Sequence, residues 1–453
     1  MIDYLHDSIS TRSSDWRVLS KRIHEFYLRD FSSIAELLKE YFPRSWQNRL
    51  QRDVSIVELI SKTLATFYRT KPTRRFFTGD GGQLSEEQSS SLRRVYDALK
   101  LDRCMKSVNE ITAVQKTCVA VLLPKPGDAE RKFIWKTFAP WEIEVDPDPI
   151  DNQSVSSAKE FRFRVPVSAT HGRVRFGRLV MNSERIYYEV GNKKTGVFTE
   201  DLSNPFPGGR YPIWVCRFST PPAGDFFCSI PSDIADMQIA SSIALSDIDF
   251  VSRFSAHGQR VLKNADVNSA EAIQFGVDSV VGLQDDQELS WLTTNNDSSS
   301  YVESVELHMK HFSNCSGLSP GIFLNKGWAT GLSKALDLHE RDGFRQDHRL
   351  ALQDAEQGMF NALRLVLNWR AGGERWPSGF VEVFHHEPPV PSDPFARAQS
   401  RRYSMEDGLV SPSEVIAQDR MIPQDEAKKT LDRNLAEYAE VRARMRPEES
   451  PGG

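Results

Sequence analysis

The stretch IPSDIADMQIASSIALSDIDF, residues 230–250, marks the point where the chain turns from short β-like runs to a long helix. Its apolar residues recur every three or four positions, which is the spacing of one helix face. They are Ile234, Met237, Ala240, Ala244 and Ile248, continued by Val251. Pro231 suits a first helical turn because its missing N–H is not needed there, and Ser229 or Ser232 can cap it. A helix is therefore predicted to begin near Pro231.

Upstream of this stretch the chain shows two kinds of hydrophobic pattern, one helical and one β-like. The first ~110 residues have helical spacing, and Pro43 and Pro72 are expected to close two of the helices. The following residues are β-like and are broken by glycine and proline turns. The predicted strands are Val119–Leu123, Phe133–Phe138, Phe161–Val165, Val174–Val180, Ile186–Val190 and Ile213–Phe218. A β-rich region is thus inserted between helical ones.

Downstream of the stretch, a second β-like segment runs from Gln259 to about Asn296, and a helix is predicted from Tyr301 to Cys315. The glycine-rich segment that follows cannot be a regular helix. The longest helical pattern then runs from Leu332 to Trp369, and Gly372-Gly373 ends it. Its apolar stripe is Leu352, Ala355, Met359, Leu363 and Val366. Two more helices are predicted in the polar tail, at 412–418 and 424–445.

Composition excludes several classes of protein. The 453 residues are 39% hydrophobic and 26% charged, which is enough to bury more than one core. No run reaches the ~18 to 20 apolar residues of a membrane span, and the first residues do not resemble a signal peptide, so we expect no membrane partner and a chain made in the cytoplasm. The net charge of -5 argues against a protein that grips nucleic-acid phosphates.

The sequence offers weak signals for catalysis. Residues 317–321, GLSPG, fit the G-x-S-x-G nucleophile elbow around Ser319, but Pro320 has no N–H to donate to an oxyanion, and no strand precedes the turn. The chain has no G-x-x-x-x-G-K-[ST] phosphate loop. We therefore expect neither a hydrolase nor an ATPase, although a hydrolase using Ser319 or an uncharted nuclease stays as an alternative.

Clusters with binding potential have ordinary explanations as well. His385-His386-Glu387 and the acidic loop at Asp146, Asp148 and Asp151 lack the spacing of metal ligands, so solvated turns and no metal are expected. The five scattered cysteines are expected to be buried free thiols, because no C-x-x-C pair is present. No cofactor is predicted.

A basic run leads out of the second predicted helix. It consists of Lys62, Arg69, Lys71, Arg74 and Arg75, with no acid between them. A solvated helix exit explains it best, and contact with DNA or with a neighbouring subunit is the alternative.

The order of these segments, from about Ile56 to Glu437, resembles the portal (head-to-tail connector) protein family of tailed double-stranded-DNA bacteriophages. IVELISKTLATFYRTKPTRRF (56–76) resembles its first helix, and KTFAPWEIEVDPDP (136–149) resembles its proline-to-aspartate strand. YPIWVCRF (211–218) and the stretch at 230–250 resemble the strand and long helix that follow. YVESVELHMKHFSNCSGLSP (301–320) and ATGLSKALDLHERDGF (329–344) resemble the returning helix, loop and crossing helix. Residues 396–431 resemble the helical C-terminal region.

The resemblance implies an α+β, mainly helical subunit of a ring with wing, stem, clip and crown parts. The implied parts are a wing at 1–230, a stem helix at 231–257, a clip at 258–297, a returning stem helix at 298–315, a channel loop at 316–331, a crossing helix at 332–371 and a crown with a disordered tail at 372–453. Lys326, Trp328 and Lys334 are then the candidates for contact with DNA in the channel. Asp233, Asp236, Asp247 and Asp249, which lie off the apolar stripe, would line that channel.

The implied function is a non-enzymatic portal at a capsid vertex of the virion, assembled in the host cytoplasm. About twelve copies would form a ring through which double-stranded DNA is packaged and ejected without sequence specificity. The implied protein partners are the terminase large subunit, a head-completion or tail adaptor, and a scaffold or major capsid protein. Another virion structural protein, such as an adaptor or minor head protein, remains the alternative.

Overall fold

The computed structural model describes residues 16–41, 54–124, 133–170, 173–197, 201–257, 259–263, 288–292, 298–316, 331–385, 394–420 and 422–445. The chain divides into two compact units, and each contains two separate pieces of sequence. Unit 1 comprises residues 1–60 and 231–344, and unit 2 comprises residues 61–230 and 345–453. The chain thus leaves unit 2 just before Pro231 and returns to it within a single long helix.

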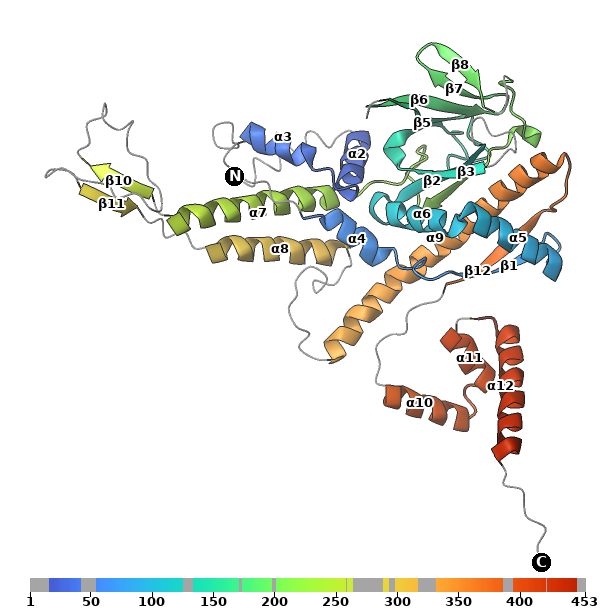
Figure 1. Ribbon diagram of the computed structural model, residues 1–453. Helices are drawn as coiled ribbons and strands as arrows, with labels where there is room; N and C mark the ends of the chain where they lie inside the picture. The colour runs from blue at the N-terminus through green and yellow to red at the C-terminus, as the bar shows by residue number, and fades with distance from the viewer. Residues whose placement is uncertain are drawn as a thin grey trace, which may run out of the picture. The chain divides into compact units, whose positions relative to one another are not determined.

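Unit 1 is built around one central helix. Its elements are α2 (Trp16–Tyr27), α3 (Ser32–Tyr41), the first turn of α4 (Ile56–Leu64), α7 (Ser232–His257), β10 (Gln259–Lys263), β11 (Glu288–Leu292), α8 (Ser298–Ser316) and the start of α9 (Gly331–Ala371). Helices α2, α3 and α8 all pack against α7 (Figure 1). The buried face of α2 presents Leu19, Ile23 and Phe26 to this small core. The predicted α7 stripe is only partly correct, because Ile234 and Met237 are buried but Ala240 is exposed. Burial extends instead to Ile239 and Ile243, since several helices cover α7.

Unit 2 contains the β-rich region. Its strands are β1 (Thr73–Thr78), β2 (Thr117–Pro124), β3 (Phe133–Phe138), β4 (Ile143–Asp146), β5 (Glu160–Thr170), β6 (Arg173–Asn182), β7 (Ile186–Val190), β8 (Lys193–Gly196), β9 (Ile213–Arg217) and β12 (Gly379–Phe384). They form an antiparallel meander β4-β5-β6-β7-β8, a three-stranded sheet β3-β2-β9 and the pair β1-β12 (Figure 1). Helices and sheets together confirm the predicted α+β class.

The sheet β3-β2-β9 is the centre of the unit 2 core. Residues 118–123 of β2 are all buried, as expected of a central strand whose two faces are covered. The helix α6 (Leu101–Gln115) packs on β2 and β3, and α5 (Glu86–Leu99) precedes it. A capping box starts α5, in which the Ser85 hydroxyl accepts from the Gln88 N–H. A local sequence signal therefore fixes where α5 begins.

The long helix α9 confirms the strongest periodicity in the sequence. It spans 41 residues, against the predicted Leu332 to Trp369, and ends where Gly372 takes a left-handed conformation. The five residues of its predicted stripe, Leu352, Ala355, Met359, Leu363 and Val366, are all buried. Helical spacing therefore identified the buried face correctly.

All six predicted strands are present in the structure, but the first ~110 residues differ from the prediction. The six predicted strands correspond to β2, β3, β5, β6, β7 and β9. The first ~110 residues are not all helical, because residues 73–78 form β1, which pairs antiparallel with β12. Helix α4 also ends at Leu64, well before Pro72. The expectation that Pro72 closes this helix was wrong, because buried irregular chain already follows Leu64.

The C-terminal part of the chain is helical. It contains α10 (Pro394–Glu406), α11 (Pro412–Arg420) and α12 (Gln424–Met445), and α11 packs on α12. The last two match the helices predicted at 412–418 and 424–445. In the part of the chain that the structure describes, no helix combines the length and the apolar character needed to cross a bilayer.

Candidate functional site

The segment that the sequence singled out forms a helix, a β-hairpin and a second helix in succession. The 26-residue helix α7 would extend about 39 Å at 1.5 Å per residue. Its end at His257 is followed almost at once by β10, which pairs antiparallel with β11, and α8 then follows. Helices α7 and α8 pack side by side (Figure 1). Helices α7 and α8 agree within a residue at each end with the helices expected at 231–257 and 298–315, and their role as a stem stays a prediction.

A buried glutamine anchors α7 to the start of α4. The Gln238 side-chain oxygen accepts from the Ile56 N–H at 2.8 Å and from the Val57 N–H at 3.3 Å. Its amide nitrogen donates to the Val54 carbonyl at 2.7 Å and to the Ser242 hydroxyl at 3.1 Å. Free N–H groups at a helix start need acceptors, and here a neighbouring helix supplies one. This fully buried contact orients α7 within unit 1.

The four aspartates proposed for the channel all lie on α7. Asp233 is exposed in the first turn, where a carboxylate is favoured by the helix dipole. Asp236, Asp247 and Asp249 are half-buried, and each interacts with another group of the chain. Among these four aspartates only Asp233 is exposed rather than half-buried.

The candidate DNA-contacting residues are placed only in part. Lys334 lies in the first turns of α9, and its side chain is not described. Lys326 and Trp328 lie outside the described residues, as does Ser319 of the G-x-S-x-G motif. Their predicted roles stay predictions.

The basic run that leads into β1 is engaged inside unit 2. The Arg74 guanidinium donates from Nε and Nη2 to the two oxygens of Glu356, at 2.9 and 2.7 Å, and from Nη1 to Asp102 at 2.6 Å. The Tyr68 hydroxyl also donates to Glu356, at 2.8 Å. Arg74 is 6% exposed and Glu356 is fully buried, so a solvated helix exit was the wrong interpretation for Arg74.

The electrostatics of this cluster follow from burial. Desolvation alone would lower the pKa of Arg74, but the charge and hydrogen bonds of Glu356 outweigh it and raise that pKa well above its usual value. Burial, with the Glu356 charge, raises the pKa of Tyr68. Two more members of the run are paired as well: the exposed Lys71 lies 2.6 Å from Asp97, and the half-buried Arg75 lies 2.6 Å from Asp425. Three of the five basic residues are therefore paired with carboxylates of unit 2, and Arg74 has a buried structural role.

The sequence analysis missed Glu356. Its signal lies in the α9 stripe: Glu356 follows Ala355 and stands four residues after Leu352, so it faces the apolar side of the helix. A carboxylate at such a position needs a buried cation as its partner. The pairing with Arg74, which is 282 residues away, could not be read from spacing.

The remaining candidate clusters have structural roles. Cys104, Cys118, Cys216 and Cys228 are buried and free, as predicted, and burial raises the pKa of Cys216 to about 12. His385 is buried against the rings of Phe67 and Tyr68, so the solvated turn predicted there was wrong for this residue. Within the described residues no three His, Cys, Asp or Glu side chains are grouped as metal ligands.

Comparisons with known proteins give only distant structural similarity. No protein-family model matches the chain, and no curated protein matches it. One similar solved structure is described as the neck of an empty GTA particle computed with C6 symmetry, with 12% identity, a TM-score of 0.38, and coverage of 81% of this chain and 88% of that one. A second is the virion of a native gene transfer agent (GTA) particle, with 11% identity, a TM-score of 0.37, and coverage of 81% and 89%. At these scores a shared fold is not established.

Proposed function

We propose that this chain is the portal subunit of a tailed double-stranded-DNA phage or a related particle. About twelve copies would form a ring at one capsid vertex, through which DNA is packaged and later ejected. The observation that supports this most is the succession α7, hairpin, α8, which forms part of unit 1 and interrupts the sequence of unit 2. A stem-and-clip insertion of this order is what the sequence resemblance implies.

The parts of the proposed subunit map onto the elements in chain order. Helices α7 and α8 are the stem, and the segment that contains β10 and β11 is the clip. The long helix α9 is the crossing helix, and α10 to α12 belong to the crown. The wing at 1–230 comprises the helical start of the chain and the β-rich part of unit 2.

The packing of the helix pair suits a rigid wall around a conduit. Two helices packed together resist bending better than a single exposed one, and the buried hydrogen bonds of Gln238 fix α7 against α4. Such a ring works without catalysis of its own, so the motor activity would come from a docked terminase large subunit. A head-completion or tail adaptor, and a scaffold or major capsid protein, would be its other partners in the virion.

Electron microscopy of the purified chain tests the proposal. We expect closed rings with a central hole, and light scattering should give a mass of about twelve chains, because head-to-tail interfaces of constant rotation close into rings. A monodisperse monomer or dimer at high concentration, with no rings on the grid, would contradict it.

The proposed channel loop needs a functional test. Lys326→Ala and Trp328→Ala should leave rings intact but impair DNA packaging or retention, because a cation and a bulky ring among glycines suit brief contact with a moving polymer. Lys429→Ala, which removes an exposed lysine from α12, is the matched control. Normal packaging with both loop variants would remove Lys326 and Trp328 from the site.

A further inference from the structure

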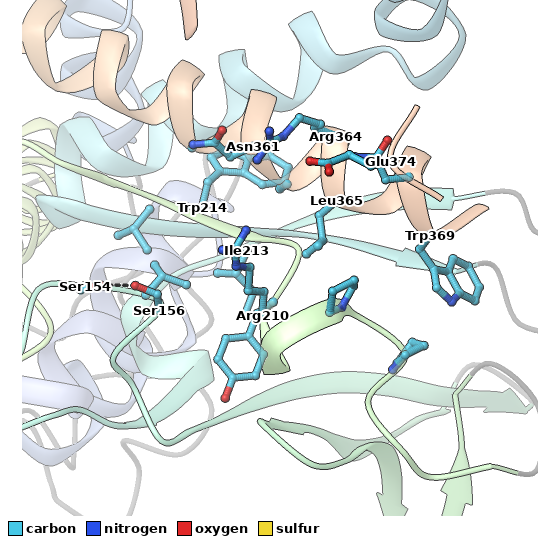
Figure 2. Close-up of a pocket in the computed structure, with 18 of the residues that line it drawn as sticks. Ser154, Ser156, Arg210, Ile213, Trp214, Asn361, Arg364, Leu365, Trp369 and Glu374 are labelled. Carbon is cyan, nitrogen blue, oxygen red and sulfur yellow. Dashed lines mark hydrogen bonds between the residues drawn. The ribbon is translucent and has the colours of Figure 1, made fainter. Parts of the chain in front are cut away.

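Unit 2 contains a pocket that is separate from the helix pair. It has a volume of about 790 Å³, within the usual range for ligand sites. Its walls come from the C-terminal half of α9, from strand β9 with the loop before it, and from the turn at Ser154–Ser156 (Figure 2). All of these residues belong to unit 2, so the pocket does not involve the α7–α8 helix pair on which the proposed portal role mainly rests.

The backbone that forms the pocket depends on glycines at two places. A Cβ on Gly358 would lie 2.9 Å from the Cβ of Trp214, so only glycine lets α9 approach β9 this closely. The end of α9 turns at Gly372, and the Asn368 side chain holds the following loop through the N–H and carbonyl of Trp376. The walls are therefore fixed without a ligand.

Positive charge dominates the pocket. Arg210, Arg217 and Arg364 line it, against the single acid Glu374. Partial burial, followed by the charge of Arg210, lowers the pKa of Arg364, so the two guanidinium groups repel each other. Among the described residues, no ion pair joins Arg210 or Arg364 to a carboxylate of the chain. The charge of Glu374 raises the pKa of Arg364 and so offsets the repulsion only in part, because the pKa of Arg364 remains lowered.

Two buried donors in the lining have no acceptor in the described part of the chain. The indole N–H of Trp214, a residue that is 1% exposed, makes no hydrogen bond. The Nη2 group of Arg217 makes none either, although its Nε donates to the Phe226 carbonyl at 3.2 Å. Each unmet donor of this kind costs about 1 to 3 kcal/mol.

Much of the remaining lining is apolar. Val155, Ile213, Leu365 and Trp369 form surfaces on which a branched or aromatic side chain can pack, and Pro205 and Pro207 extend them. A bare phosphate would leave these surfaces unused. A peptide that carries a carboxylate beside an apolar side chain uses both kinds of surface.

We propose that this pocket binds a short segment of a partner protein in which an aspartate or glutamate adjoins a branched or aromatic apolar residue. The carboxylate lies between Arg210 and Arg364, and the apolar side chain packs on Ile213 and Leu365. Ser154 and Ser156, whose hydroxyls are 2.7 Å apart, supply further hydrogen-bonding groups from the adjacent turn.

Paired peptide arrays test the proposal on the full chain. One array displays octapeptides with a central Asp or Glu flanked by all combinations of Leu, Val, Phe and Pro, and its twin replaces the acid with Asn or Gln. We expect binding to the acidic array only, and at least a tenfold weaker affinity for the best acidic peptide with Arg364→Gln or Arg210→Gln. Arg370→Gln, which removes an exposed arginine on α9 outside the pocket, should bind as the unmodified chain does.

Several outcomes would overturn the proposal. Equal binding to both arrays, no binding to either, or unchanged affinity in both pocket variants would exclude an acidic peptide as the ligand. Competition of the best peptide by inorganic phosphate or by duplex DNA at equal concentration would instead assign the arginines to phosphate. Melting temperatures for each variant show whether it is folded, and Arg210, which is exposed in a loop, keeps the test valid if Arg364→Gln does not fold.

Discussion

Glu356 shows how a single buried charge can organise a core. Its two oxygens accept from Arg74 and Tyr68, and Arg74 in turn reaches Asp102 and lies 4.9 Å over the ring of Tyr96. Every charge of Arg74 and Glu356 thus has a partner. Removal of one partner from such a buried pair leaves the other charge without compensation in the protein interior. The resulting loss of stability exceeds the net stabilisation that the intact pair provides.

We predict that Glu356→Gln lowers the free energy of unfolding by about 3 to 5 kcal/mol, because the buried Arg74 then keeps only the partly exposed Asp102 as an anion. Urea denaturation measures the change. The double variant Arg74→Met/Glu356→Gln should lose clearly less than the two single losses added together. Glu437→Gln, at an exposed pair with Arg433 on α12, should change stability by less than about 0.5 kcal/mol. Additive losses would show that the two residues act independently.

The buried His348 is expected to make the free energy of unfolding depend on pH. His348 stacks on Phe218 with ring centroids 3.8 Å apart, and burial, followed by the charge of Lys116, lowers its pKa from 6.5 to about 4. The unfolded chain therefore takes up this proton at higher pH than the folded chain does. The stabilisation is complete above pH 6.5 and is lost as pH falls through 4.

His348→Phe keeps the stacking and removes the proton site. We predict that this variant loses less stability than the unmodified chain between pH 6.5 and 4, by up to roughly 3 kcal/mol. His308→Phe, at an exposed position of α8, should leave the pH profile unchanged. Parallel profiles for all three proteins, measured by urea denaturation at each pH, would show that His348 does not titrate differently in the folded state.

At the scale of elements, hydrophobic periodicity predicted burial and helix bounds correctly where a residue's environment depends on its own helix or strand. The stripe of α9 and the ends of α12 could be predicted because burial repeats at the helical spacing. Strand β1 could not, because it is stabilised by β12, about 300 residues further along the chain. The arginine pocket could not be predicted for the same reason, because its walls come from three stretches that are far apart in the sequence.

The buried stripe of α9 predicts a contrast between two leucines of one helix. Leu363 is fully buried and Leu350 is 70% exposed. Leu363→Ala should lower the free energy of unfolding by about 2 to 5 kcal/mol, because it removes buried apolar surface and leaves a cavity. Leu350→Ala, the same chemical change, should cost less than about 0.5 kcal/mol. Equal melting temperatures for the two variants would contradict the assigned face.

At the scale of the whole molecule, net charge determines whether the proposed ring attracts or repels DNA. The chain carries a net charge of -5, so about twelve copies carry about -60. The segment from Pro231 to Asp297 contributes strongly, with eleven acids against Arg253, Arg260 and Lys263. A field of this sign repels a polyanion at long range. The proposed conduit would therefore not capture free DNA by electrostatic attraction.

The isolated ring should accordingly bind duplex DNA weakly and without sequence preference. Each phosphate neutralised by a fixed lysine or arginine releases counterions and adds affinity, and a moving duplex would have to break that contact at every step. In the proposed ring an acidic wall would leave DNA free to slide, and Lys326 of the proposed channel loop and Lys334 would offer only brief contacts. Binding of duplexes with different sequences at moderate salt measures this directly. Affinity in the nanomolar range that depends on sequence would contradict the conduit and indicate a DNA-binding regulator instead.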